Sequence, residues 1–205
     1  MDSIIFDLDG TLWDASNTIV EAWNKVLHKN SYDQITKEKL QGVTGLQMKE
    51  IFQVLFPDLN DDKQNQLIKE CCEFEHKYVK ENGGELYDNL EETLITLSKN
   101  YKLFIVSNCQ DGYIEAFYDY HKLDKYFLDY ENPGRTGLTK GENIKLVMER
   151  NNLANPIYVG DIEGDMNAAK FAGIPFMYAS YGFGEVKQFD YSIDRFENIL
   201  DVLTI

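Results

Sequence analysis

"IIFDLDGTLWD", residues 4–14, begins as a short apolar run and continues at once with two carboxylates, Asp7 and Asp9. In an extended chain, residues i and i+2 share a face, so we expect these two side chains to converge. At about 6 Å and an effective dielectric of about 20, two such charges repel each other by about 3 kcal/mol. The pair therefore requires a bound cation, a shared proton or full solvation.

Three further apolar runs resemble the first strand, at residues 102–108 ("KLFIVSN"), 156–161 ("PIYVGD") and 174–180 ("IPFMYAS"). Runs of this length, rich in Ile, Val, Phe and Tyr, are typical of strands that are buried on both faces. Stretches with helical spacing lie between them, as in the leucines of residues 90–97. The alternation predicts an α/β fold, with a parallel, Rossmann-like sheet and right-handed crossovers.

The segment from residue 14 to about residue 82 follows a different pattern. It contains no convincing strand, and it has three apolar stripes with helical spacing, the last of which stops at the glycine pair Gly83-Gly84. We therefore predict an all-helical cap at residues 14–83, inserted after the first strand, and an α/β core made of residues 1–13 and 84–205.

The composition excludes several classes of protein. The 205 residues include 35 Asp and Glu against 20 Lys and Arg, a net charge of −15. A chain this acidic is a poor general binder of nucleic acid or of anionic membranes. No apolar run approaches 18 residues, and the three cysteines have no metal-finger spacing. We expect a cytoplasmic protein, a monomer or weak homodimer, with no nucleic-acid or membrane partner.

Polar side chains stand where the predicted strands end. They are Asp7 and Asp9 after the first strand, Ser107 and Asn108 after the second, and Asp161, with Asp165 one helical turn later, after the third. Each alone fits a turn or a helix cap. In open parallel sheets, however, ligands bind at the carboxyl ends of the strands. Several carboxylates there suit Mg²⁺, which binds carboxylates together with substrate phosphate.

These residues also carry a resemblance to a known family. "FDLDGT" (6–11), "VSN" (106–108), Lys140 and "GDIEGD" (160–165) resemble, in the same order, the four motifs of the haloacid dehalogenase superfamily. "HKLDKYFLDY" and "NAAKFAGIPFMYASYGFG" are similar to segments of the branch that has a helical cap and includes the phosphoglycolate phosphatases. The resemblance implies a Mg²⁺-dependent phosphatase that hydrolyses a small phosphorylated metabolite through an aspartyl-phosphate intermediate.

The same resemblance implies a role for each motif residue. Asp7 would be the nucleophile and Asp9 the general acid and base. The phosphate would be bound by Ser107, Asn108 and Lys140. The Mg²⁺ ligands would be Asp7, the backbone carbonyl of Asp9 and Asp161, with Asp165 in a supporting position.

Two alternatives remain open at this point. A phosphomutase of the same branch, similar to β-phosphoglucomutases, would return the phosphoryl group to its substrate, and a non-catalytic binding or regulatory module would keep only the fold. The sequence also departs from the family pattern. Gly141 follows the lysine where proline is common, and the cap has no arginine. A second anionic group on the substrate would therefore have to be bound by a lysine such as Lys49, or not at all.

Overall fold

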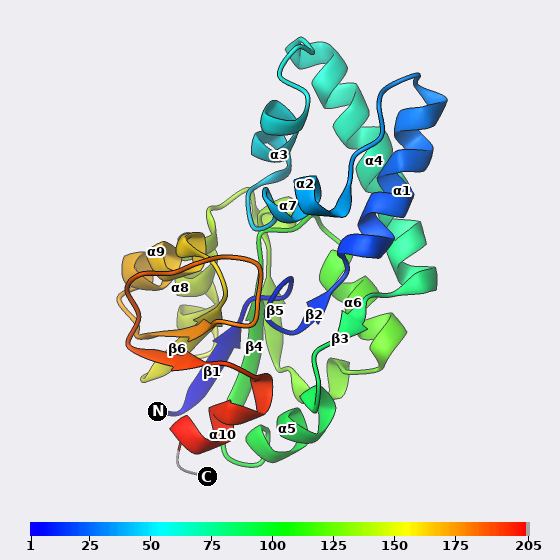
Figure 1. Ribbon diagram of the computed structural model, residues 1–205. Coiled ribbons are helices and arrows are strands. Elements are labelled where there is room, and N and C mark those ends of the chain that lie inside the picture. The colour runs from blue at the N-terminus through cyan, green and yellow to red at the C-terminus, as the bar shows by residue number, and fades with distance from the viewer. Residues whose placement is uncertain (204–205) are drawn as a thin grey trace.

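The computed structural model describes residues 1–203 as a parallel sheet covered by helices, with further helices above one end of the sheet (Figure 1). The six strands are β1 (Ser3–Phe6), β4 (Lys102–Val106), β5 (Asp129–Glu131), β6 (Pro156–Gly160), β7 (Phe176–Ala179) and β8 (Tyr191–Ile193). Their order is β5-β4-β1-β6-β7-β8, and every neighbouring pair is parallel. The predicted α/β fold is confirmed.

The two edge strands, β5 and β8, were not predicted. Each has only three residues, "DYE" and "YSI", and neither forms an apolar run. Their pairing depends on the neighbouring strand, which local sequence patterns do not report.

The sheet is buried on both faces, as the continuous apolar strands predict. Successive side chains of β1 alternate between two cores: Ile4 and Phe6 pack on one side, and Ile5 packs on the other. The first side is covered by α5 (Leu90–Leu97), α6 (Tyr113–His121) and, near the C-terminus, η2 (Phe196–Asn198) and α10 (Ile199–Val202). The second side is covered by α8 (Lys140–Arg150) and α9 (Glu163–Ala172). The remaining short helices are η1 (Asp124–Tyr126) and α7 (Pro133–Thr136).

Residues 14–83, which we call the cap segment, contain four helices. These are α1 (Ser16–Lys29), α2 (Lys37–Gln41), α3 (Met48–Leu55) and α4 (Asp61–Asn82). They enclose a hydrophobic cluster of their own, which includes Trp23, Phe52 and Leu67. Two short strands that were not predicted, β2 (Trp13–Asp14) and β3 (Glu85–Leu86), pair antiparallel where the chain enters and leaves the cap segment. No helix within residues 1–203 combines the length and the apolar character needed to cross a membrane.

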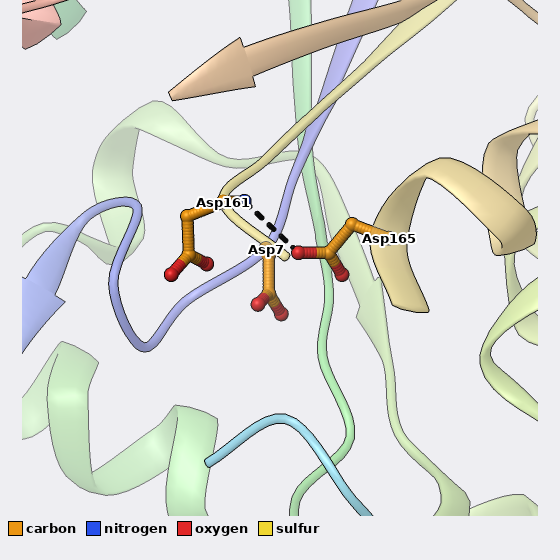
Figure 2. A group of neighbouring side chains, drawn as sticks. All are labelled: Asp7, Asp161 and Asp165. Atoms are coloured by element: carbon orange, nitrogen blue, oxygen red, sulfur yellow. Dashed lines mark hydrogen bonds between the residues drawn. The ribbon is translucent and has the colours of Figure 1, made fainter. Parts of the chain in front are cut away.

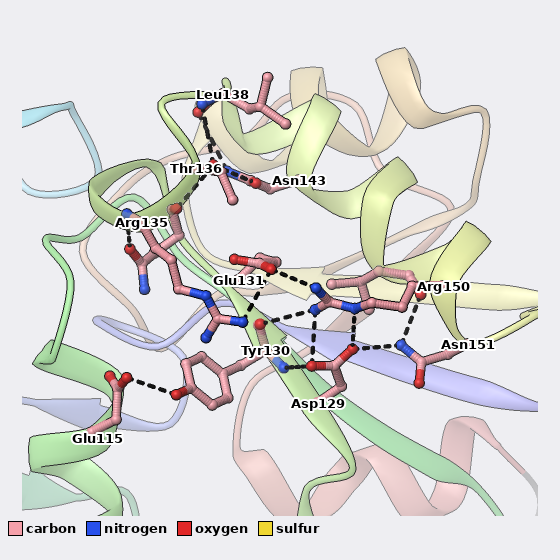
Figure 3. A network of polar contacts seen from close by, with 12 residues as sticks. Glu115, Asp129, Tyr130, Glu131, Arg135, Thr136, Leu138, Asn143, Arg150 and Asn151 are labelled. Carbon is pink, nitrogen blue, oxygen red and sulfur yellow. Dashed lines mark hydrogen bonds and ion pairs between the residues drawn. The ribbon is translucent and has the colours of Figure 1, made fainter.

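An ion-pair network holds α8 against β5 (Figure 3). Arg150, at the C-terminal end of α8, lies 2.8 Å from a carboxylate oxygen of Asp129 and 2.7 Å from one of Glu131. The Glu131 side chain is almost fully buried, and Arg135 lies 3.4 Å from it on its other side. Because Glu131 is buried, removal of Arg150 would leave much of its charge uncompensated, so this network favours the position of α8 against β5. The other end of α8 carries Lys140.

We predict that Gly83→Ala destabilises the protein more than Gly137→Ala does. Gly83 ends α4 with φ 65° and ψ −163°, a region essentially restricted to glycine, and a Cβ there would overlap the ring of Tyr120. We expect a loss of about 2–3 kcal/mol in the free energy of unfolding, measured by urea denaturation.

Gly137 is the matched control, because it also has positive φ but no atom lies within 4 Å of a Cβ placed there. Its substitution should cost only about 1 kcal/mol. Equal losses in the two variants would contradict the role that we assign to Gly83.

Candidate active site

Three buried carboxylates meet at the carboxyl ends of the central strands (Figure 2). Asp7 follows β1, Asp161 follows β6, and Asp165 lies in the first turn of α9. One oxygen from each lies within 4.8 Å of the other two. All three residues are at most 2% exposed. The pairing of β1 with β6 therefore brings Asp7 close to Asp161 and Asp165, which lie 154 and 158 positions later in the sequence.

Lys140 is the cation beside this group. Its Nζ lies 3.0 Å from Oδ1 of Asp7 and 2.5 Å from Oδ1 of Asp165, and the residue is 5% exposed. Burial opposes the charge on Lys140, but Asp165 and Asp7 outweigh that effect and hold its pKa above the usual range. The ammonium group is therefore charged at neutral pH.

One lysine does not balance three carboxylates. Burial, followed by the charge of Asp165, raises the pKa of Asp7 to about 6, although Lys140 and the Ser107 hydroxyl act against the shift. Burial and the charges of Asp165 and Asp7 also hold the pKa of Asp161 well above its usual range. A divalent cation among these oxygens would offset the remaining charge, and an all-oxygen ligand set is the kind that Mg²⁺ prefers. The residues present fit that ion.

Asp165 and Asp161 are also fixed by hydrogen bonds. One carboxylate oxygen of Asp165 accepts from the backbone N–H groups of Asp161 (3.0 Å) and Ile162 (3.1 Å), while the other faces Lys140. Asp161 accepts from the backbone N–H of Phe183 at 2.7 Å. These contacts favour a supporting position for Asp165 and a more available carboxylate for Asp161.

The turn after β1 needs glycine because of Asp161. Gly10 has φ +83°, a conformation that side chains rarely adopt, and a Cβ there would overlap the Asp161 carboxylate. The glycine of "FDLDGT" thus lets the backbone approach the carboxylate directly.

Asp9 turns away from the group of three carboxylates. Its Oδ1 accepts a hydrogen bond of 2.9 Å from the hydroxyl of Tyr113 on α6. Burial and the neighbouring charge of Asp7 raise the pKa of Asp9 to about 8. The two aspartates of the opening motif therefore stand in different surroundings, and Asp9 is the one that favours a proton.

The two residues after β4 also differ from each other. Ser107 is 3% exposed, and its hydroxyl lowers the pKa of Asp7 against the larger effect of burial. Asn108 turns its amide group toward the cap segment, where Nδ2 donates to the backbone carbonyl of Gly45 at 2.8 Å. Asn108 thus joins the core to the cap segment, a contact that its place in the motif did not suggest.

Sequence reasoning missed Glu75, a carboxylate of the cap segment. It lies on α4, is 2% exposed, and accepts hydrogen bonds from Nε1 of Trp23 and Nε2 of Gln110. Burial raises the pKa of Glu75 to about 7. A signal for it existed, because Glu75 stands four residues after Cys71 and four before Val79 on the buried stripe of the helix.

The Glu75 carboxyl should make stability depend on pH. Its pKa rises from 4.5 to about 7 on folding, so the folded state holds a proton that the unfolded chain has already released. Raising the pH from about 4.5 to above 7 should therefore cost wild type up to about 3 kcal/mol of unfolding free energy relative to Glu75→Gln. Urea denaturation across this pH range measures the difference, and parallel curves for the two proteins would contradict the prediction.

The chain is similar to known proteins over nearly its whole length, and the matched region includes the residues of this site. The family model of haloacid dehalogenase-like hydrolases matches residues 4–179. Phosphoglycolate phosphatase of Photobacterium profundum is 26% identical to this chain, over 98% of the chain and 95% of the relative. Pyrophosphatase PpaX of Bacillus cereus is 24% identical, over 100% and 97%.

A solved structure supports the fold. The crystal structure of a predicted phosphoglycolate phosphatase from Haemophilus somnus superposes with a TM-score of 0.88 at 22% identity, covering 99% of this chain and 98% of that one. At this identity the likeness concerns the fold alone. The family model, which matches most of the chain and includes the motifs of Asp7, Asp9, Lys140 and Asp161, shows more: the chain belongs to the haloacid dehalogenase-like hydrolases.

Proposed function

We propose that the protein is a Mg²⁺-dependent phosphatase that hydrolyses a small phosphorylated metabolite through an aspartyl-phosphate intermediate. The observation that carries this proposal is the group of three buried carboxylates with Lys140 against two of them. Membership of a hydrolase family, and relatives named phosphoglycolate phosphatase and pyrophosphatase, support it.

In the first step, a carboxylate oxygen of Asp7 attacks phosphorus, and the bond from phosphorus to the leaving oxygen breaks. Lys140 and the Ser107 hydroxyl face the phosphoryl oxygens and stabilise their charge. Asp7, Asp161 and the backbone carbonyl of Asp9 would hold Mg²⁺, which supplies further neutralisation of phosphoryl charge when bound.

Asp9 acts as general acid in the first step and as general base in the second. In its protonated form it gives its proton to the leaving alkoxide, so the alcohol departs neutral. It then takes a proton from the water that attacks the phosphorylated Asp7, which releases phosphate and restores both carboxyl groups. The hydrogen bond from Tyr113 holds the Asp9 carboxyl in place. Ester and water are thereby converted to alcohol and phosphate.

We expect Asp7→Asn to remove phosphatase activity. An amide in place of the attacking carboxylate cannot form the covalent intermediate, so turnover of p-nitrophenyl phosphate in Mg²⁺ should fall by at least about 1,000-fold. Chelation of Mg²⁺ with EDTA should abolish wild-type turnover, and added Mg²⁺ should restore it. Asp2→Asn, the same change at the other end of β1, should stay active; full activity in Asp7→Asn would refute the mechanism.

Asp9→Asn should affect esters according to their leaving groups. Alkoxides need a proton to depart, whereas p-nitrophenolate does not. We expect kcat/KM for an alkyl phosphate to fall by about 100- to 10,000-fold, and that for p-nitrophenyl phosphate to fall much less. Tyr113→Phe, which leaves the carboxyl but removes its hydrogen bond, should give a smaller change of the same kind. Equal losses on both esters in Asp9→Asn would exclude the proposed acid role.

A further inference from the structure

A small chamber lies between the core and the cap segment, next to Asp9. Its volume is about 50 Å³, so only a compact group fits inside it. Its lining includes apolar side chains of the cap segment, among them Trp23, Leu40 and Ile51, while Asn108, Gln110 and Tyr113 come from the core. Asp9, the proposed general acid, is part of this wall. The leaving group that it would protonate would therefore lie in the chamber.

Glu75 places a carboxylate in that wall without a counter-charge. Its two oxygens accept from Trp23 and Gln110, but neither donor is charged. No lysine, arginine or histidine lines the chamber, and none forms an ion pair with Glu75, within residues 1–203. The ionised form of a carboxyl group buried in this way is costly, which raises the pKa of Glu75, and a cation in the chamber would stabilise that form.

Asn108 adds a second acceptor to the same wall. Its Nδ2 donates to the carbonyl of Gly45, which fixes the orientation of the amide because a carbonyl can only accept. The opposite atom, Oδ1, is buried and has no hydrogen-bond partner in the described part of the chain. Asn108 therefore presents an oxygen without a donor, and Glu75 presents a carboxylate that has hydrogen bonds but no cation beside it.

We propose that Glu75 selects a leaving group that carries an ammonium group, so that the preferred substrates are phosphate esters of short amino alcohols. This inference rests on the proposed phosphatase function and names its substrate class. The ammonium would supply the missing counter-charge to Glu75 and can donate to Oδ1 of Asn108 as well.

Other classes of leaving group suit the chamber less well. The leaving groups of phosphoglycolate and pyrophosphate carry negative charge, which the Glu75 carboxylate would repel when it is ionised. A polyol needs several hydrogen-bond partners, whereas most of the wall is apolar. A purely apolar alcohol would leave Oδ1 of Asn108 without a donor and Glu75 without a cation, and buried unpaired polar groups are penalised.

The test compares four small phosphate esters: 2-aminoethyl phosphate, 2-hydroxyethyl phosphate, propyl phosphate and phosphoglycolate. For wild type we expect kcat/KM to be highest for the aminoethyl ester, by about 10- to 100-fold over the hydroxyethyl ester, the range of a charge-assisted contact. In Glu75→Gln this ratio should fall to about 3 or less.

Two further variants complete the test. Glu73→Gln removes an exposed carboxylate from the same helix and should keep the wild-type ratio. Glu75→Asp keeps the charge and should retain a preference for the ammonium ester, which separates loss of charge from damage to the fold.

The outcomes are distinguishable. If wild type hydrolyses p-nitrophenyl phosphate but prefers phosphoglycolate, or does not distinguish the aminoethyl from the hydroxyethyl ester, the inference is wrong and the phosphatase function stands. An unchanged ratio in Glu75→Gln also overturns the inference. If no ester is hydrolysed, p-nitrophenyl phosphate included, the proposed function fails and the inference fails with it.

Discussion

The contact of Lys140 with Asp7 and Asp165 is the interaction on which the site depends. Three carboxylates buried within 4.8 Å of one another repel strongly, and a single ammonium group offsets only part of that repulsion. Contacts from the surrounding fold hold Lys140 and the carboxylates in place. The Arg150 network holds α8, and hence Lys140, against the sheet, while backbone N–H groups bind Asp165. The incomplete charge balance is the physical reason for expecting a divalent cation.

The two carboxylates of the opening motif are separated by their surroundings, although they are only two residues apart. Asp7 faces Lys140 and the other metal-binding candidates, whereas Asp9 faces Tyr113 and the chamber under the cap segment. Burial raises the pKa of both, but that of Asp9 the more. One carboxylate is thereby suited to attack phosphorus and the other to carry a proton, which is the division of roles that we propose.

The cap segment is a packed unit that also reaches the site. Its own cluster around Trp23 and Phe52 stabilises the helices, and the same Trp23 donates to Glu75 in the chamber wall. The contact between Asn108 and Gly45 then links this wall to the end of β4. Residues that pack the cap segment therefore also shape the space beside Asp9, and this coupling is why we look for substrate selection there.

The sequence by itself determined the fold class, the four main strands and the residue types at the strand ends, because buried strands and ligand-bearing turns leave local patterns. It missed β2, β3, β5 and β8, whose two or three residues are held by pairing partners and not by their own composition. Only the tertiary structure decided that Asn108 turns to the cap segment and that Asp9 and Glu75 share a chamber. Those relations join residues 63 and more positions apart in the sequence. Burial, and the lack of a counter-charge to Glu75 within residues 1–203, arise only when the chain has folded.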